Sequence, residues 1–298
     1  MSFLHRALVR RRVASPLRCF ATSEEGNDIK LSRSPCGLWA TLTMARPQSH
    51  NALSVGMIDG FYGHLEALAA VEHEMPRAVF LRAEGKTFCA GGDLKAMRAS
   101  GTKCRAENVS EAMHLSGVFA ALRNFPRPVV ALVDGPCFGG GVGIISACDM
   151  AFATPKSLFA LSEVTLGVIP ATISPFVIDR MGPSAASRYF LTAERFDAAE
   201  AHRVGLLHGV VEEEGLEEGR GGLDKLEASL RTSFSRCSPQ ALAASKRLIA
   251  DVAHRPPNSA ALQVATADYL ADVRQSADGQ EGMLAFIEKR KPNWNPSD

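Results

Sequence analysis

Short apolar runs alternate with helical patterns along the first two thirds of the chain. Four runs are typical of β-strands, because they are short, rich in strand-forming residues and bounded by turn residues; they cover residues 37–45, 77–84, 128–135 and 149–154. Helical patterns cover residues 57–71, 109–124, 141–147, 185–191 and 198–204. Strand, helix and strand in this order predict an α/β fold with a largely parallel sheet.

The pattern changes after about residue 195. Strand patterns almost vanish there, and helical patterns separated by the polar stretch VEEEGLEEGRGG take over. We therefore expect a core domain over residues 24–195 and a C-terminal helical subdomain over residues 196–298, preceded by a leader over residues 1–23.

The leader is basic. The first twenty residues, MSFLHRALVRRRVASPLRCF, carry five arginines and no acidic residue, and Leu4, Ala7 and Leu8 recur at helical spacing opposite Arg6 and Arg10. This arrangement is typical of a cleavable mitochondrial transit peptide; an arm that binds nucleic acid or membrane is the alternative. Without the leader, 28 basic residues face 32 acidic ones, and a mildly acidic chain is a poor nucleic-acid binder. We expect a mitochondrial matrix protein without a nucleic-acid partner.

Composition excludes several other classes. A chain of 298 residues, of which 46% are hydrophobic and 22% charged, can bury a sizeable core in one or two domains. Seven cysteines without a CxxC pair indicate neither a zinc site nor a disulfide framework, so we expect reduced and mostly buried thiols and no metal. No stretch approaches about eighteen uninterrupted apolar residues, and no membrane span is predicted.

Two glycine-containing turns directly follow strands, FCAGGDLKAM at 88–97 and CFGGGVG at 137–143. Neither fits a nucleotide-binding motif. The GKT before the first turn lacks the leading glycine of a P-loop, since Phe80 stands at that position, and the second turn places Ile144 or Ser146 at the last glycine of GxGxxG.

Glycine lets a backbone N–H approach a ligand closely, and a turn that opens a helix directs such donors outward. Two donors from separate turns can meet at one carbonyl oxygen and form an oxyanion hole, where each is worth about 2.7–4 kcal/mol in the transition state. Tight packing of helix on sheet is the alternative reason for glycines after strands. The occurrence of two such turns in matching context favours the oxyanion hole.

Four blocks resemble the crotonase superfamily of enoyl-CoA hydratases and isomerases. In order, they are RPQSHNALS, GKTFCAGGDLKAM, PVVALVDGPCFGGGVGIISACDMAFAT and FALSEVTLGVIPATISP, and the resemblance covers about residues 37–292. It implies a repeated ββα core with C-terminal trimerisation helices, assembled as a homotrimer or a dimer of trimers. It implies no cofactor, since coenzyme A enters as part of the substrate thioester. LSEVTLGVIPATISP and RYFLTAERFDAAEAHRVGLLHGVV are most similar to methylglutaconyl-CoA hydratases and related enzymes of carboxylated substrates in leucine and isoprenoid breakdown.

The resemblance also implies roles for single residues. The backbone N–H groups of Gly92 and Gly140 would form the oxyanion hole, and Glu163 would be the catalytic carboxylate. Glu163 lies in an apolar segment, where desolvation would raise its pKa toward the range useful for acid–base catalysis; a surface glutamate in a loop is the alternative. The substrate or coenzyme A site would comprise Asn51, Ala52, Leu53, Ala90, Gly91, Asp93, Leu94, Lys95, Lys289 and Arg290. For the last two, a solvated terminal charge run is the alternative.

The sequence departs from the two-glutamate hydratases of this family at one position, where Gly143 stands in place of the first glutamate. A lone carboxylate suits an isomerase, which moves one proton, whereas hydration would require Glu163 to act as base and then as acid, or to borrow a water or the carboxylate of the substrate. The similarity to the carboxylated-substrate branch favours hydration of a 2-enoyl-CoA such as methylglutaconyl-CoA. An enoyl-CoA isomerase and a non-catalytic acyl-CoA or RNA-binding protein on the same fold are the alternatives. Arg98, Arg188 and Arg195 are candidates to bind a distal carboxylate.

Overall fold

A six-stranded sheet forms the centre of the molecule. The computed structural model describes residues 28–212 and 221–295, so the predicted leader lies outside the described residues. The strands follow the order β1 (Ile29–Arg33), β2 (Trp39–Met44), β3 (Ala78–Ala83), β4 (Val129–Val133), β6 (Met150–Ala153) and β9 (Gly209–Val210). Only β1 runs antiparallel to its neighbour. The α/β fold with a largely parallel sheet is confirmed, and the four predicted strands appear within two residues of their predicted bounds.

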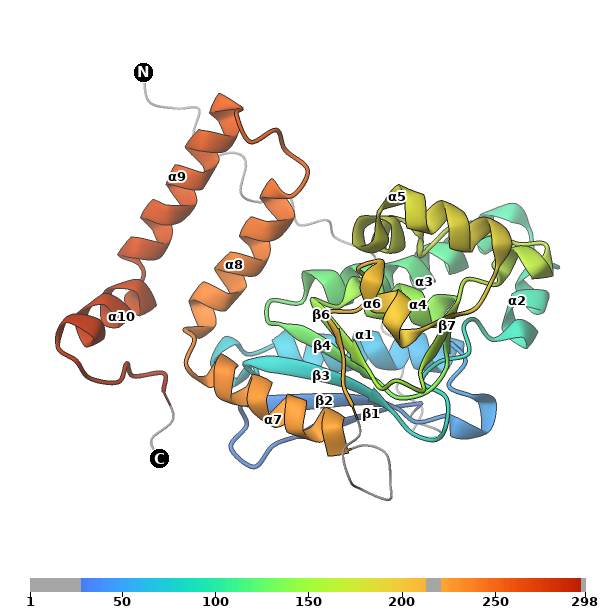
Figure 1. The fold of residues 1–298 in the computed structure, drawn as a ribbon, viewed down its shortest axis with the longest axis horizontal. Helices are drawn as coiled ribbons and strands as arrows, with labels where there is room; N and C mark the ends of the chain where they lie inside the picture. Colours follow the sequence, from blue (N-terminus) through green and yellow to red (C-terminus); the bar gives the residue numbers. More distant parts are fainter. Residues whose placement is uncertain (1–27, 213–220, 296–298) are drawn as a thin grey trace.

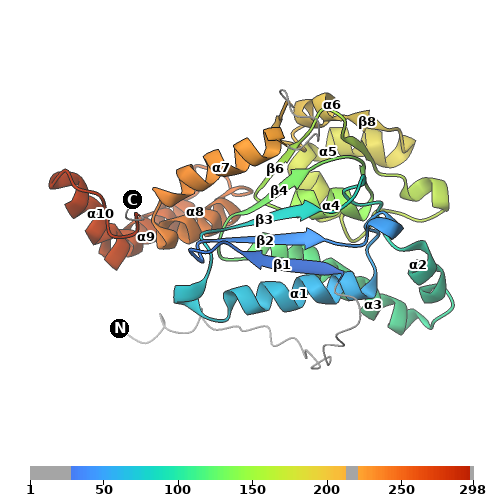
Figure 2. The same ribbon diagram turned by 90° about the horizontal axis from the view of Figure 1, so that it is seen from below.

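Both faces of this sheet are buried. Successive side chains of a strand point to opposite faces, so one strand contributes to two cores. On β3, Val79 and Leu81 belong to the larger core, whereas Ala78 and Phe80 belong to a smaller core on the other face. The larger core contains residues of α1 (Val55–Ala69), α3 (Arg105–Asn124), α4 (Gly140–Ala147) and α5 (Ser174–Thr192). The smaller core contains Leu223 and Phe234 of α7 (Gly221–Ser235) (Figure 2). The sheet is therefore a layer between helices.

A second, smaller sheet lies in the chain segments that follow the main strands. It contains β5 (Cys137–Phe138), β7 (Leu158–Ala160) and β8 (Phe196–Asp197), with β7 in the middle. These strands are too short to produce a recognisable alternation of apolar and polar residues, and they were not predicted. Their importance is positional, since β5 leads directly into α4 and β7 leads into the 3-10 helix η3 (Glu163–Leu166).

The predicted helices are present. The bounds of α1, α3, α4 and α6 (Ala198–Arg203) lie within four residues of those predicted, and α5 is longer, since it begins eleven residues before the predicted residue 185. A kink at Gly182, where φ is 75° and ψ is 160°, and Pro183 after it interrupt the helical pattern. The remaining short segments are α2 (Leu94–Ser100), η1 (Pro47–Ser49) and η2 (Glu72–Glu74).

The C-terminal part is helical. After α7, the helices α8 (Pro239–Val252), α9 (Ala260–Gln275) and α10 (Ala277–Ile287) form an arm that extends away from the sheet (Figure 1). The arm exposes large apolar side chains, among them Phe286 and Ile287, which are 86% and 75% exposed. The division at residue 195 and the trimerising role of the arm stay predictions.

The six described cysteines are free thiols, but they are not mostly buried as predicted. Three of them are buried, and Cys36, Cys104 and Cys237 are exposed because they lie in loops or at helix ends. Within the described part of the chain, none of the helices is long and apolar enough to cross a membrane.

Candidate active site

Three chain segments that are distant in sequence lie side by side beyond the main strands. Leu53 and Gly92 pair in a parallel β-bridge, and Cys89 and Cys137 pair in another. The Leu53 N–H donates to the Gly91 carbonyl at 2.8 Å, and the Phe138 N–H donates to the Cys89 carbonyl at 2.8 Å. The first glycine turn is therefore held between the 51–53 segment and β5.

The two predicted donor turns are neighbours. A Cβ on Gly91 would lie 3.7 Å from the Gly140 nitrogen, and a Cβ on Gly140 would lie 3.9 Å from the Gly91 carbonyl carbon. Gly140 is the first residue of α4, where a helix has no internal acceptor for its N–H groups. Within residues 28–212 and 221–295, the N–H groups of Gly92 and Gly140 donate no hydrogen bond to the protein. Both donors are thus available to a ligand.

Glycine is required in these turns. Gly91 has φ of 97° and Gly139 has φ of 49°, a region that residues with a side chain rarely adopt. At Gly139 a side chain would also be blocked in space, since its Cβ would lie 2.9 Å from Oε1 of Glu163. The absence of a side chain at Gly139 therefore leaves room for the Glu163 carboxyl beside the donor turn.

Glu163 is placed there by β7. The Gly139 N–H donates to the Ala160 carbonyl at 2.9 Å, so the end of β7 is fixed against the turn, and Glu163 follows three residues later at the start of η3. Its Oε2 atom is buried and has no hydrogen-bond partner among the described residues. Burial raises the pKa of Glu163. A partly desolvated carboxyl beside two free N–H donors suits general acid–base chemistry next to a polarised carbonyl.

A second carboxylate does not fit where the two-glutamate enzymes carry one. Gly143 is buried, and a Cβ at this position would lie 2.2 Å from Cγ2 of Ile173 and 3.2 Å from Cε1 of Phe119. Ile173, the residue before α5, occupies that space. The position therefore lacks both the carboxyl group and the room for one.

The side chain of Asn51, a residue predicted to belong to the substrate site, points into the protein. Its side chain is fully buried, and its Nδ2 donates to the carbonyls of Glu84 and Thr87 at 2.9 and 2.8 Å. Its Oδ1 accepts from the Arg46 N–H at 2.8 Å. The side chain thus joins two turns, and Asn51 itself adopts a positive φ of 53°.

The other predicted site residues of the first half of the chain surround the donor turn. Leu53 is buried, and its Cδ1 lies 2.7 Å from the point where a Cβ on Gly140 would be. Asp93 caps α2 by accepting from the N–H groups of Lys95 and Ala96 at 3.0 and 3.3 Å. Ala52 and Gly91 lie in the paired segments, and Ala90, Leu94 and Lys95 are exposed beside them.

Within a single chain, Lys289 and Arg290 lie far from this site. They follow α10, which lies at the opposite end of the molecule from α2 (Figures 1 and 2). Arg290 is paired with Glu281 at 2.7 Å, and this partner raises the pKa of Arg290.

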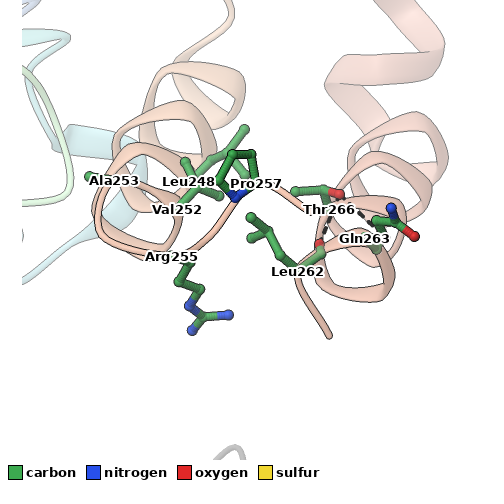
Figure 3. Close-up of a pocket in the computed structure, with 8 residues that line it drawn as sticks. All are labelled: Leu248, Val252, Ala253, Arg255, Pro257, Leu262, Gln263 and Thr266. Atoms are coloured by element: carbon green, nitrogen blue, oxygen red, sulfur yellow. Dashed lines mark hydrogen bonds between the residues drawn. The ribbon is translucent and has the colours of Figure 1, made fainter. Parts of the chain in front are cut away.

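A groove also opens on the arm. It measures about 540 Å³ and opens between α8 and α9, where Leu248, Val252, Pro257 and Leu262 line it (Figure 3). It contains none of the predicted catalytic residues. We therefore locate the active site by the chemistry of the glycine turns and Glu163 and not by cavity volume.

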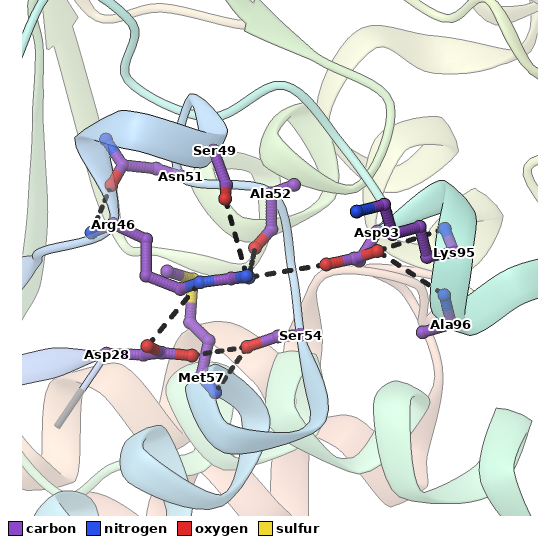
Figure 4. Close-up of polar contacts among 10 residues, drawn as sticks. All are labelled: Asp28, Arg46, Ser49, Asn51, Ala52, Ser54, Met57, Asp93, Lys95 and Ala96. Carbon is purple, nitrogen blue, oxygen red and sulfur yellow. Dashed lines mark hydrogen bonds and ion pairs between the residues drawn. The ribbon is translucent and has the colours of Figure 1, made fainter. Parts of the chain in front are cut away.

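Sequence reasoning missed Arg46. It belongs to the RPQSHNALS block, but its role depends on contacts made in three dimensions. Its guanidinium lies between Asp28 and Asp93, 3.5 and 3.4 Å from their carboxylate oxygens (Figure 4).

A parallel α/β layer that ends in two donor turns and a buried carboxyl is an enzyme site for a carbonyl-containing substrate. Comparison with known proteins gives the family. The sequence model of the enoyl-CoA hydratase/isomerase family matches residues 39–297, so the chain belongs to this family. Relatives in this family are named enoyl-CoA hydratases, and the chain is an enzyme of this type.

Relatives with this name come from fungi, animals and bacteria. Enoyl-CoA hydratase ACTT6 of Alternaria alternata is 36% identical over 177 residues, which cover 59% of this chain and 57% of that protein. Enoyl-CoA hydratase domain-containing protein 3, mitochondrial, of Rattus norvegicus is 31% identical over 262 residues, covering 85% of this chain and 80% of that protein. The crystal structure of an enoyl-CoA hydratase from Shewanella pealeana superposes with a TM-score of 0.80 at 34% identity, covering 90% of this chain and 96% of that chain.

Proposed function

We propose that this enzyme adds water to a branched, carboxylated 2-enoyl-CoA thioester such as methylglutaconyl-CoA, with Glu163 as the catalytic residue. The observation that supports this proposal is the position of the Glu163 carboxyl. Its Oε1 lies against Gly139, and the next residue in the chain, Gly140, offers an unused N–H. A thioester oxygen bound to Gly92 and Gly140 would place the conjugated carbons next to this carboxyl.

The reaction would proceed through an enolate. As water attacks C3, the Glu163 carboxylate takes its proton, and the electron pair of the double bond moves through C2 onto the thioester oxygen. The N–H groups of Gly92 and Gly140 stabilise that charge, each by about 2.7–4 kcal/mol. The protonated Glu163 then returns the proton to C2. A group that serves as base and then as acid needs a pKa closer to neutrality than an exposed glutamate has, and burial of Glu163 moves its pKa in that direction.

Substitution of the carboxyl tests the catalytic role. Glu163→Gln should lower turnover by about 10²–10⁴-fold, the usual contribution of general acid–base catalysis, while acyl-CoA binding stays nearly unchanged. A panel of enoyl-CoA thioesters, followed by mass spectrometry for the gain of one water, identifies the substrate. Glu66→Gln, which removes an exposed acid of α1, is the matched control. A Glu163→Gln enzyme that hydrates at the wild-type rate would contradict the proposal.

The filled space at Gly143 supports isomerisation as a second candidate function. With Ile173 against Gly143, that position supplies no second acid–base group, and Glu163 alone suffices to move a proton between C4 and C2. The two reactions change the conjugated enoyl absorbance in opposite directions. A hydratase consumes this absorbance by adding water to a 2-enoyl-CoA, whereas an isomerase creates it from a 3-enoyl-CoA.

Arg195 is our candidate for binding a distal carboxylate. Its guanidinium carbon lies 5.5 Å from the centre of the Phe138 ring, and Phe138 immediately precedes the donor turn. Arg188, in contrast, is already paired with Glu194 at 2.5 Å. Arg195→Gln should lower kcat/KM for a carboxylated enoyl-CoA by about 10–100-fold more than for a neutral one, as expected for a charge-assisted hydrogen bond. Equal losses for both substrates, or the same selectivity change in Arg188→Gln, would contradict this role.

We further propose that the mature enzyme works in the mitochondrial matrix as a homotrimer or a dimer of trimers. The basic leader and the mitochondrial rat relative support the location, and the apolar residues exposed on the arm support the assembly. Lys289 and Arg290 would contact coenzyme A phosphates only within such an assembly, because α10 is far from α2 in one chain. Light scattering after size-exclusion chromatography measures the number of subunits, and a monomer would contradict this part of the proposal.

A further inference from the structure

Arg46 makes contacts on three sides, shown in Figure 4. It lies between β2 and η1, and its side chain is only 18% exposed. Its Nη1 donates to the Ala52 carbonyl at 3.0 Å and to Oδ2 of Asp93 at 3.4 Å. Its Nε is 3.5 Å from Oδ1 of Asp28, whose other oxygen accepts from the Ser54 hydroxyl at 2.5 Å. One guanidinium thus joins the 52–54 segment to the start of α2.

These contacts flank Gly92. Ala52 precedes Leu53, which pairs with Gly92, and Asp93 follows Gly92. The Leu53 N–H bonds the Gly91 carbonyl at 2.8 Å, and the Asp93 N–H bonds the Leu53 carbonyl at 3.2 Å. Arg46 therefore closes a ring of polar contacts around the Gly92 peptide. A rotation of the Gly91–Gly92 peptide would have to break the bond from the Leu53 N–H to the Gly91 carbonyl, and Arg46 holds Ala52 and Asp93 on either side of that bridge.

We propose that Arg46 is a positioning residue that holds the Gly92 N–H in its orientation toward the thioester oxygen. This inference rests on the proposed function, because it assigns Gly92 as an oxyanion donor. An oxyanion hole depends on N–H donors that are fixed in place before the reaction, and small displacements of such donors lower the reaction rate. Arginine suits this role better than lysine, since its planar fork can bond a carbonyl and a carboxylate at once.

A positioning role and a purely structural role differ in kinetics. For Arg46→Gln we expect kcat to fall about 10–100-fold with KM changed less than about threefold, which is less than the 10²–10³-fold cost of losing a donor outright. Arg46→Lys should recover part of kcat, because it restores the charge but not the fork. Arg33→Gln is the matched control, because Arg33 also donates to a backbone carbonyl, that of Glu74 in η2, but at the other end of β1. It should keep the wild-type kcat.

A spectroscopic measurement tests the orientation of the donors directly. A saturated acyl-CoA with a ¹³C-labelled thioester carbonyl binds without reacting, and hydrogen bonds in an oxyanion hole lower the stretching frequency of that carbonyl. We expect a clear shift in the wild-type enzyme and in Arg33→Gln, and a smaller one in Arg46→Gln. An unchanged shift together with an unchanged kcat in Arg46→Gln would overturn the role of Arg46. If the wild-type enzyme itself binds the thioester without a shift, the oxyanion hole of the proposed function fails first.

A second variant covers the case in which Arg46→Gln does not fold, as judged by circular dichroism. Asp93→Asn removes the ion pair with Arg46 but keeps an oxygen that can cap α2. It should show the same reduced carbonyl shift and lowered kcat. The double variant, if folded, should lose no more than the worse single variant, since both single changes break the same Arg46–Asp93 contact. A normal shift and kcat in folded Asp93→Asn would overturn the inference.

Discussion

Gly139→Ala tests whether the donor turn and the catalytic carboxyl are built as one unit. Gly139 has φ of 49° and ψ of −115°, a conformation that alanine adopts only under strain. The new Cβ would lie 2.9 Å from Oε1 of Glu163, whereas ordinary contacts begin at 3.4 Å. The substitution therefore strains the backbone and pushes the Glu163 carboxyl away from its place.

The backbone strain and the displacement of Glu163 can each be given an expected size. A residue held in a sparsely populated backbone region costs about 1–3 kcal/mol, which sets the expected loss in the free energy of unfolding. Relief of the contact requires Glu163 to move by about 0.5 Å. Since a displacement of about 1 Å can cost about 10²-fold in rate, we expect kcat to fall about tenfold in the folded enzyme.

The control for Gly139→Ala is Gly182→Ala. Gly182 also has a conformation that favours glycine, with φ of 75°, but a Cβ there would meet no atom within 4 Å. Thermal unfolding by circular dichroism measures stability, and turnover per folded enzyme is measured well below both midpoints. Both variants should be destabilised, but only Gly139→Ala should lose turnover. If both keep the wild-type kcat, or if both lose it equally, the contact between the turn and Glu163 does not control catalysis.

Two further predictions concern stability. Burial raises the pKa of Glu163 in the folded state, so ionisation of this carboxyl opposes folding as the pH rises from the unfolded pKa through the folded one. The Glu163→Gln enzyme should therefore have a higher melting temperature than the wild-type enzyme at pH 7. This difference in melting temperature should vanish below about pH 4. Equal midpoints at pH 7 would contradict desolvation of this carboxyl. Gly143→Ala should destabilise by about 1–3 kcal/mol in urea unfolding, because its Cβ meets Ile173. Gly143→Ala combined with Ile173→Ala should cost less than the sum of the two single changes.

The sheet could be predicted because its inner strands are buried on both faces. Parallel strands of this kind appear as continuous apolar runs, such as AVFL in β3 and VVALV in β4. Helix α4 followed from its position after the glycines. The helix α2 was missed because its short segment LKAMRAS has no buried face. The Asp93 cap before it was the available signal, since aspartate commonly begins helices.

The surroundings of the site could be predicted only in part. The glycine turns are local motifs whose chemistry is visible in the residues themselves, whereas Glu163 was assigned through the resemblance of its block to the crotonase superfamily. Arg46 is different, because its partner Asp93 lies 47 residues further along the chain and the contact exists only after the turns have met. Asn51 was assigned to the substrate site from its block, but its buried amide bonds backbone carbonyls of another turn. Such contacts depend on the tertiary packing.

Under the proposed function, the filled space at Gly143 leaves Glu163 as the acid–base residue of the site. In a pair of neighbouring carboxylates, each group raises the pKa of the other by like-charge repulsion. Here Ile173 fills the space that a second carboxylate at position 143 would need. Desolvation therefore raises the pKa of Glu163 without repulsion from a neighbouring carboxylate. Burial is the larger effect on this pKa, and the backbone N–H of Glu163 itself acts in the opposite direction; among the described residues, Oε2 has no partner that would lower the pKa further. Under the proposed function, the cost in stability of this buried oxygen would accompany the ability of Glu163 to act as base and then as acid.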